Sequence, residues 1–164
     1  MAPLHVVPLA LAIALVAASA PSPPAYTDWS APENLGPHVN SPFADFGPAL
    51  SRDGLQLYFA SDRPGGAGVY DLWVCQRSDD ESDWSVPDNI GPSVNTAFIE
   101  GPPTVSRDGH WLIFNSDRPG GAGLNDLWVS YRENIHDPFG WERPFNLGRV
   151  NTPFQDQGAS WFAN

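Results

Sequence analysis

The octapeptide "SDRPGGAG" occurs twice in this chain, at 61–68 and again at 116–123. Both copies are followed, two residues later, by "DLWV". An acid and a base beside a glycine-rich loop suit a ligand cradle, whereas a segment that recurs unchanged suits the scaffold of a repeat. The surrounding sequence favours the scaffold, because the similarity extends far beyond these eight residues.

The similarity has a period of 55 residues. "DWSAPENLGPHVNSPF" begins at Asp28 and "DWSVPDNIGPSVNTAF" at Asp83. "SRDGLQLYFASDRPGGAGVYDLWV" begins at Ser51 and "SRDGHWLIFNSDRPGGAGLNDLWV" at Ser106. A third, partial copy begins at Gly140. We therefore predict repeat units at 28–82, 83–139 and, in part, 140–164.

Each unit predicts four short strands and no helix. In the first unit we expect them at 47–51, 55–61, 71–77 and 84–90. Asp53 and Gly54 form a hairpin turn signal between the first two strands, and Pro87 favours an edge position for the fourth. Short antiparallel strands in fours, recurring at this spacing, are typical of propeller blades. The expected fold is all-β, a partial β-propeller of four-stranded antiparallel blades with about two full blades plus flanking strands.

The pattern of residues 51–74 and 106–129, with "SRDG", "SDRPGG" and "DLWV" at fixed positions, resembles the WD-like propeller repeat of TolB-type proteins. The resemblance implies a bacterial cell-envelope protein and rings that usually have six blades. TolB-type proteins carry an extra N-terminal domain, and related envelope proteins often add a peptidoglycan-binding domain; we expect neither within these 164 residues. Two blades do not close a ring, so we expect either a fragment of a longer protein or copies that associate as a homo-oligomer to complete one.

Composition and the N-terminal segment indicate compartment and partners. The formal net charge is −11 and all eight basic residues are Arg, which disfavours nucleic acid and anionic membrane surfaces as partners. Residues 1–25 contain a short apolar run ending in small residues and predict a secretory signal peptide with a Pro-rich junction. We expect a periplasmic or secreted protein without membrane insertion after cleavage, with an uncleaved anchor as the alternative. Cys75 is expected to be a buried apolar residue.

Propeller connectivity predicts which loops share a face. "DRPGGAG" and "NxGPxVN" should lie on one face, with "SRDG" and "SDDESD" on the opposite one. The aspartates of the repeated loops are expected to accept backbone hydrogen bonds within their own loops or to pair with the adjacent arginines. The functional alternative is a ligand or partner site on the loop face. The candidate binding residues are Asp45, Asp62, Arg63, Glu100, Trp111, Asp117 and Arg118.

The tryptophans divide into a regular set and an exception. Trp73 and Trp128 occupy matching places in the third strand, and Trp29, Trp84 and Trp141 open the fourth, which predicts packing between blades. Trp111 breaks the pattern, because the matching residue of the first unit is Gln56. That makes Trp111 a candidate contact residue.

Catalytic signatures are missing from the sequence. It contains no G-x-S-x-G, H-E-x-x-H, C-x-x-C or P-loop pattern, so we expect no catalytic residues, no metal ligands and no cofactor, with Ca²⁺ as a minor alternative. The preferred interpretation is a non-catalytic binding or scaffold module for a protein, peptide or glycan partner. The alternatives are the propeller part of a hydrolase, peptidase or glycosidase, and a truncated fragment without independent function.

Overall fold

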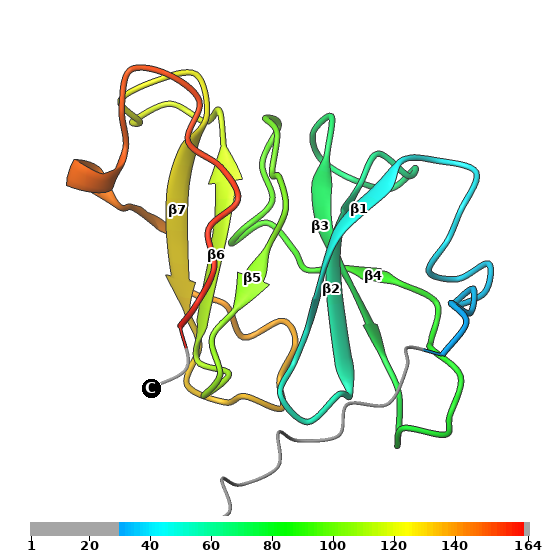
Figure 1. Ribbon diagram of the computed structural model, residues 1–164. Helices are drawn as coiled ribbons and strands as arrows, with labels where there is room; N and C mark the ends of the chain where they lie inside the picture. Colours follow the sequence, from blue (N-terminus) through cyan, green and yellow to red (C-terminus); the bar gives the residue numbers. More distant parts are fainter. Residues whose placement is uncertain (1–29, 163–164) are drawn as a thin grey trace, which may run out of the picture. The chain divides into compact units, whose positions relative to one another are not determined.

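The computed structural model describes residues 30–162, and the predicted signal peptide and Trp29 lie outside them. The compact unit that begins at Glu33 contains two four-stranded antiparallel sheets (Figure 1). Within the described residues no helix is long and apolar enough to cross a bilayer. The all-β part of the fold prediction is confirmed.

The two sheets have the same topology. The first sheet has the order β1 (Asp45–Leu50), β2 (Gln56–Ser61), β3 (Asp71–Gln76) and β4 (Asp88–Asn89). The second sheet has the order β5 (Thr104–Val105), β6 (Trp111–Ser116), β7 (Asp126–Tyr131) and β8 (Phe145–Asn146), after which a 3₁₀ turn spans Gly148–Val150. The registers also match, since Ser61 opposes Asp71 in the first sheet and Ser116 opposes Asp126 in the second.

The second and third strands lie where the sequence predicts them, and the outer strands differ from prediction. β1 begins at Asp45 rather than at Gly47, and its register with β2 shifts between Phe46 and Ala49. The predicted strand 84–90 shortens to Asp88–Asn89, directly after Pro87, whose nitrogen has no hydrogen to donate to β3. The fourth strand is therefore a short edge pairing.

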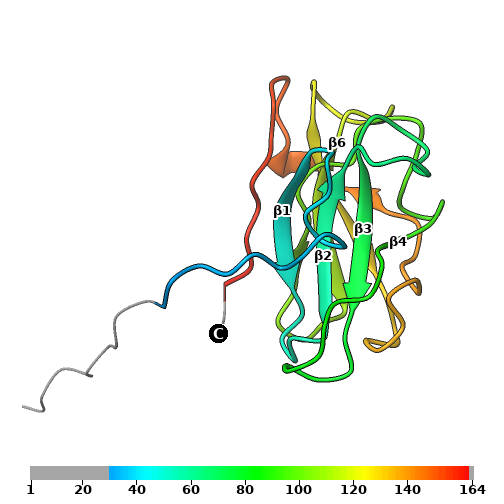
Figure 2. The same cartoon turned by 90° about the vertical axis from the view of Figure 1, so that its right-hand side faces the viewer.

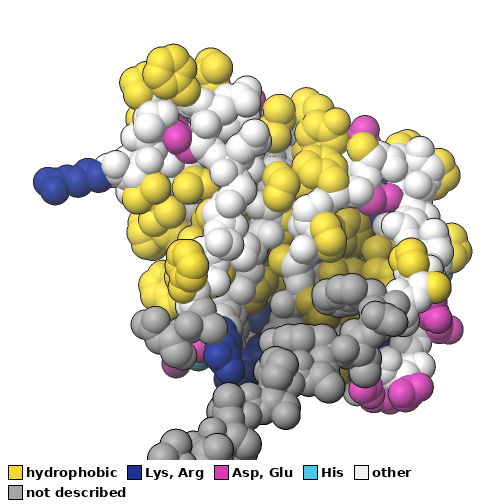
Figure 3. Space-filling model, viewed as in Figure 1, with side chains coloured by type: hydrophobic (Ala, Val, Ile, Leu, Met, Phe, Trp, Pro, Cys, Tyr) yellow, Lys and Arg dark blue, Asp and Glu magenta, His cyan; other side chains and the backbone are white. Residues whose placement is uncertain are grey.

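The main apolar core lies between the two sheets. β2 and β3 contribute Tyr58, Ala60, Leu72 and Val74, and the second sheet contributes Leu112, Phe114 and Trp128, with Trp141 beside them. Tyr58 and Trp141 meet edge to face, with ring centroids 5.9 Å apart. Figure 2 shows the sheets one behind the other, and Figure 3 shows hydrophobic side chains in the hollow between them. The predicted packing role of Trp128 and Trp141 is thus confirmed.

A second cluster covers the other face of the first sheet. It contains Leu57, Phe59, Trp73 and Cys75, with Val39 packed on them and Trp84 at the margin. Cys75 is fully buried, as expected, and burial raises the pKa of its thiol to about 11. A thiol in this state is a packing residue rather than a nucleophile.

Strand direction sorts the loops into two ends. The β1–β2 and β5–β6 turns lie together with the β3–β4 and β7–β8 loops, and the β2–β3 and β6–β7 loops lie at the opposite end of the sheets (Figure 1). In the first turn, Asp53 Oδ1 accepts from Leu55 N at 3.1 Å and Gly54 has φ 76°, as the turn signal predicts. Serine closes the turn, because Ser51 Oγ donates to the same carboxylate at 2.6 Å.

Candidate functional site

Two sets of loops form the face with the candidate residues. The glycine loops are residues 62–70 and 117–125, between β2 and β3 and between β6 and β7. The leading loops are residues 40–44, 95–99 and 151–155, which precede the first strand of each repeat unit.

Arg63 ties its glycine loop to the residues on either side of the leading loop of the same sheet. Its Nη2 donates to Asp45 Oδ1 at 2.6 Å and to Val39 O at 3.0 Å, while its Nε donates to Ser61 Oγ at 3.1 Å. The guanidinium carbon stands 4.7 Å from the centroid of the Phe59 ring. Every face of the group is therefore occupied by the protein itself.

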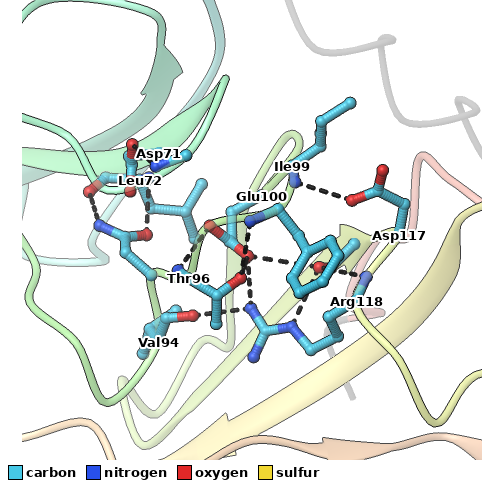
Figure 4. A network of polar contacts seen from close by, with 12 residues as sticks. Asp71, Leu72, Val94, Thr96, Ile99, Glu100, Asp117 and Arg118 are labelled. Carbon is cyan, nitrogen blue, oxygen red and sulfur yellow. Dashed lines mark hydrogen bonds and ion pairs between the residues drawn. The ribbon is translucent and has the colours of Figure 1, made fainter.

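Arg118 repeats this arrangement in the second sheet. Its Nη2 donates to Glu100 Oε1 at 2.8 Å and to Val94 O at 2.7 Å, and its Nε donates to Ser116 Oγ at 3.0 Å. Figure 4 shows Arg118 and Glu100 meeting within this network. Glu100 occupies the position that Asp45 has in the first unit. Its side chain is one methylene longer, and it forms the same ion pair with the arginine.

The pKa values of the two acids shift in opposite directions, because Glu100 is more deeply buried than Asp45. Glu100 is fully buried, and desolvation raises its pKa despite the bonds from Thr96 and Arg118. Burial acts in the same direction on Asp45, but hydrogen bonds from Arg63, Ser61 and Ser41 outweigh it and lower its pKa to about 2. Both acids hold their leading loops, through Ser41 N at 2.6 Å and Thr96 N at 2.9 Å.

Asp62 and Asp117 have partners that the sequence did not predict. Asp62 Oδ1 accepts from Ala44 N at 2.8 Å, and Asp117 Oδ1 accepts from Ile99 N at 2.7 Å. These amides belong to the leading loops, so neither expected interaction, within the glycine loop or with the adjacent arginine, is the one formed. Among the described residues the salt bridges of the two arginines go to Asp45 and Glu100.

The glycines of the octapeptide sit against the next repeat unit. A Cβ built on Gly68 would lie 1.9 Å from Phe98 O, and one built on Gly123 would lie 2.3 Å from Phe154 O. Glu100 N donates to Tyr70 O at 2.9 Å across the same boundary. Only a residue without a side chain allows backbones to approach this closely. The octapeptide is therefore the joint between units, which answers the question raised by its repetition.

A set of asparagines, which the sequence placed on the loop face, completes the joint. Asn95 and Asn151 hydrogen-bond both the N–H and the carbonyl of the third strand of the preceding unit, at Leu72 and Leu127 respectively. The repeated "NxGPxVN" pattern was the available signal, since its last Asn recurs in all three units.

Trp111 lies away from this face. It is half-buried and packs on Tyr131 with ring centroids 4.8 Å apart. Together with Trp161 and Phe162 it lines a cavity of about 600 Å³ beside the "SRDG" turns. The seven sequence candidates therefore separate into six residues of the loop joints and Trp111 at the other end of the sheets.

Several large apolar side chains of the loop face are exposed to solvent. On the leading and glycine loops they are between 40 % and 74 % exposed: Phe43, Val69, Phe98, Leu124 and Phe154. Phe43, Phe98 and Phe154 occupy matching positions of three successive units, as Val69 and Leu124 do in two. Leu124 N donates to Phe154 O at 3.1 Å, which places the two kinds of loop side by side. The loops thus bury the arginine–acid pairs and direct these repeated apolar side chains into solvent, beside the exposed Asp62 and Asp117.

Comparison with known proteins does not assign the chain to a family. No family model matches the chain, and no curated protein matches it in sequence. Within residues 30–162 no group of three or more His, Cys, Asp or Glu side chains is arranged to hold a metal ion.

Proposed function

We propose that this chain is an exported, non-catalytic binding module, built of TolB-like propeller repeats, that presents its loop face to a protein or peptide partner. One observation carries the proposal. The repeated arginines and their paired acids bond within the joints of the face, and the repeated aromatic side chains left in solvent are Phe43, Phe98 and Phe154. Exposed aromatic side chains that recur on one face are typical of protein contact surfaces.

The chemistry of the face favours a protein partner over a glycan. Sugar hydroxyls need free hydrogen-bonding groups, whereas Arg63, Arg118 and Glu100 already bond within the joints. Apolar side chains of a peptide would bury the phenyl rings without that requirement. The net charge of −11 further favours a partner that is neutral or basic.

A displayed random-peptide library tests the proposal with a defined probe. Peptides selected on the mature wild-type chain should lose binding to a variant carrying F43S, F98S and F154S. The matched control carries V86S, F139S and F145S, which are equally exposed but lie outside the glycine and leading loops. Selected peptides that bind both triple variants equally, or a library that yields no peptides while a glycan array gives a loop-dependent signal, would overturn the proposed partner class.

Export rests on the sequence of residues 1–25 alone. N-terminal sequencing of the protein recovered from periplasm or medium should find the apolar run removed. A mature chain that retains Met1 in the cytoplasm would contradict this part of the proposal.

A further inference from the structure

A cavity of about 380 Å³ lies at the end of the sheets opposite the glycine loops. Its walls are the β1–β2 turn with Ser51–Asp53, the β5–β6 turn with Arg107–Gly109, and the β7–β8 loop. The last supplies Arg132, Ile135 and His136. A volume of this size accommodates a small organic molecule.

The charge around this cavity is opposite to that of the chain. Three of the eight arginines line it, Arg52, Arg107 and Arg132, together with His136, against two carboxylates. The carboxylates belong to the turns: Asp53 Oδ1 accepts from Ser51 Oγ and Leu55 N, and Asp108 Oδ1 accepts from His110 N. In Figure 3, Lys or Arg side chains gather at the lower end of the molecule, where Figure 1 shows these turns. A cluster of positive charge on a chain of net charge −11 is therefore a candidate binding site for an anion.

Arg132 is the most informative member of the group. It is 1 % exposed, and all its hydrogen-bond acceptors are neutral. Nε donates to Gly109 O at 2.8 Å, and Nη1 donates to Gln56 Oε1 at 2.9 Å and Tyr58 OH at 2.8 Å. A buried guanidinium is ordinarily paired with an anion. Among the described residues Arg132 forms no salt bridge and its Nη2 has no hydrogen-bond partner, although the residue lines the cavity.

Arg77 is the residue of the first unit that matches Arg132, and comparing the two shows which contacts of Arg132 are structural. Arg77 Nε donates to Gly54 O at 2.8 Å, as Arg132 does to Gly109 O. Both guanidinium groups also stack on a tryptophan, Trp84 at 4.6 Å and Trp141 at 4.3 Å. The shared contacts explain why an arginine occurs at this position. They do not explain why the second copy is enclosed beside Arg52 and Arg107.

We propose that this cavity binds an oxyanion group, a carboxylate or a phosphate, with Arg132 at its base and Arg52 and Arg107 at its mouth. The planar guanidinium fork suits both groups. The ligand supplies the negative charge that Arg132 lacks within the chain. The exposed arginines at the mouth close over the same anion from the two turns. The site is distinct from the loop face, so its test and the peptide test can fail separately.

Titration of the wild-type chain with inorganic phosphate and, separately, citrate tests the site, with chloride at equal ionic strength as reference. Amide NMR signals of Gly109 and His136 should shift saturably with at least one of the two anions. The response to each anion distinguishes a phosphate ligand from a carboxylate ligand. Absence of a saturable shift with both anions would overturn the proposal.

Two double variants distinguish binding in this cavity from a general effect of the net charge on anion binding. R52Q/R107Q should weaken binding at least about tenfold, because each lost charged hydrogen bond contributes on this order. R143Q/R149Q removes the same charge at exposed positions away from the cavity and should weaken binding less than about threefold. Equal weakening in the two double variants would contradict the site. R132K, checked for folding by circular dichroism, should bind more weakly still; if it does not fold, the double variants decide.

Discussion

Asn95 binds both backbone polar atoms of Leu72, because Leu72 N donates to Asn95 Oδ1 and Asn95 Nδ2 donates to Leu72 O, each at 2.9 Å. Asn151 binds Leu127 in the same way, at 2.8 Å and 3.0 Å. Each asparagine thus gives the leucine amide its acceptor and adds a second donor to a carbonyl that already accepts from the residue after β4 or β8, Ile90 N at 3.2 Å or Leu147 N at 3.0 Å. The asparagine belongs to one repeat unit and the leucine to the unit before it, so the two units are joined by backbone-like bonds.

Asn95→Ala should therefore destabilise the chain by about 2 kcal/mol, because it leaves the buried amide of Leu72 without a partner. The Leu72 carbonyl loses one of its two donors and keeps Ile90 N, at 3.2 Å. Asn40 occupies the matching position of the first unit, is exposed, and donates Nδ2 to Asn34 Oδ1 at 3.1 Å. Asn40→Ala should cost no more than about 1 kcal/mol. Urea unfolding of the two variants measures the difference, and equal losses would show that the bonds to Leu72 contribute little.

Gly68→Ala should disturb the joint between units more than any alanine substitution in an open loop. Its Cβ would meet a backbone oxygen, Phe98 O, which cannot rotate away. At Gly140 the nearest atom to a new Cβ is Asp137 Oδ2, at 3.0 Å on a flexible side chain. We expect a loss of about 3 kcal/mol or more for Gly68→Ala and about 1 kcal/mol or less for Gly140→Ala. Thermal unfolding with the same melting temperature for both would refute the close approach.

Removal of one member of the Glu100 and Arg118 pair should be costly. Glu100→Gln leaves the Arg118 guanidinium buried without its carboxylate, and such a change typically costs about 3–5 kcal/mol. Glu133→Gln, at an exposed position, is the control for loss of one negative charge. The double variant E100Q/R118Q should lose less than the sum of the two single changes. Additive losses in a double-mutant cycle would mean that the two groups do not interact.

The low pKa of Asp45 should make the free energy of unfolding depend on pH in the acid range. Its pKa in the folded chain is about 2, below the ordinary value of 3.8. A depressed carboxyl pKa gives stability that is complete above about pH 4 and is lost as the pH falls toward 2. The wild-type chain should therefore lose stability between pH 4 and pH 2 more steeply than Asp45→Asn. Chemical unfolding at several pH values measures this slope, and the argument is wrong if Asp45→Asn and the wild type have parallel profiles.

Local patterns predicted the sheets well. The Asp53-Gly54 turn, the second and third strands and the buried tryptophans between sheets all follow from features within a single repeat unit. These features depend on neighbours in sequence or on the period of two along a strand.

Partners across loops could not be predicted in the same way. Arg63 lies beside Asp62 in the sequence and binds Asp45, because the turn of the glycine loop brings it to the leading loop. The repeat held a usable signal, since Asp45 and Glu100 occur at matching positions and keep an acid while changing its length. No comparable pattern in the sequence predicted that the Arg132 side chain is buried. It matches Arg77 in sequence, and only the stacking of the second sheet on the first encloses it.

The two ends of the sheets differ in their tolerance of length. The glycine loops are identical in length, and the backbone of each packs closely against the leading loop of the following unit. The β3–β4 connection spans 77–87, whereas the β7–β8 connection spans 132–144 and is two residues longer. Foreign peptide inserted at 78–82 should consequently leave the chain folded, whereas the same insert within 64–68 should uncouple the two sheets, so a tag or reporter belongs in the first position.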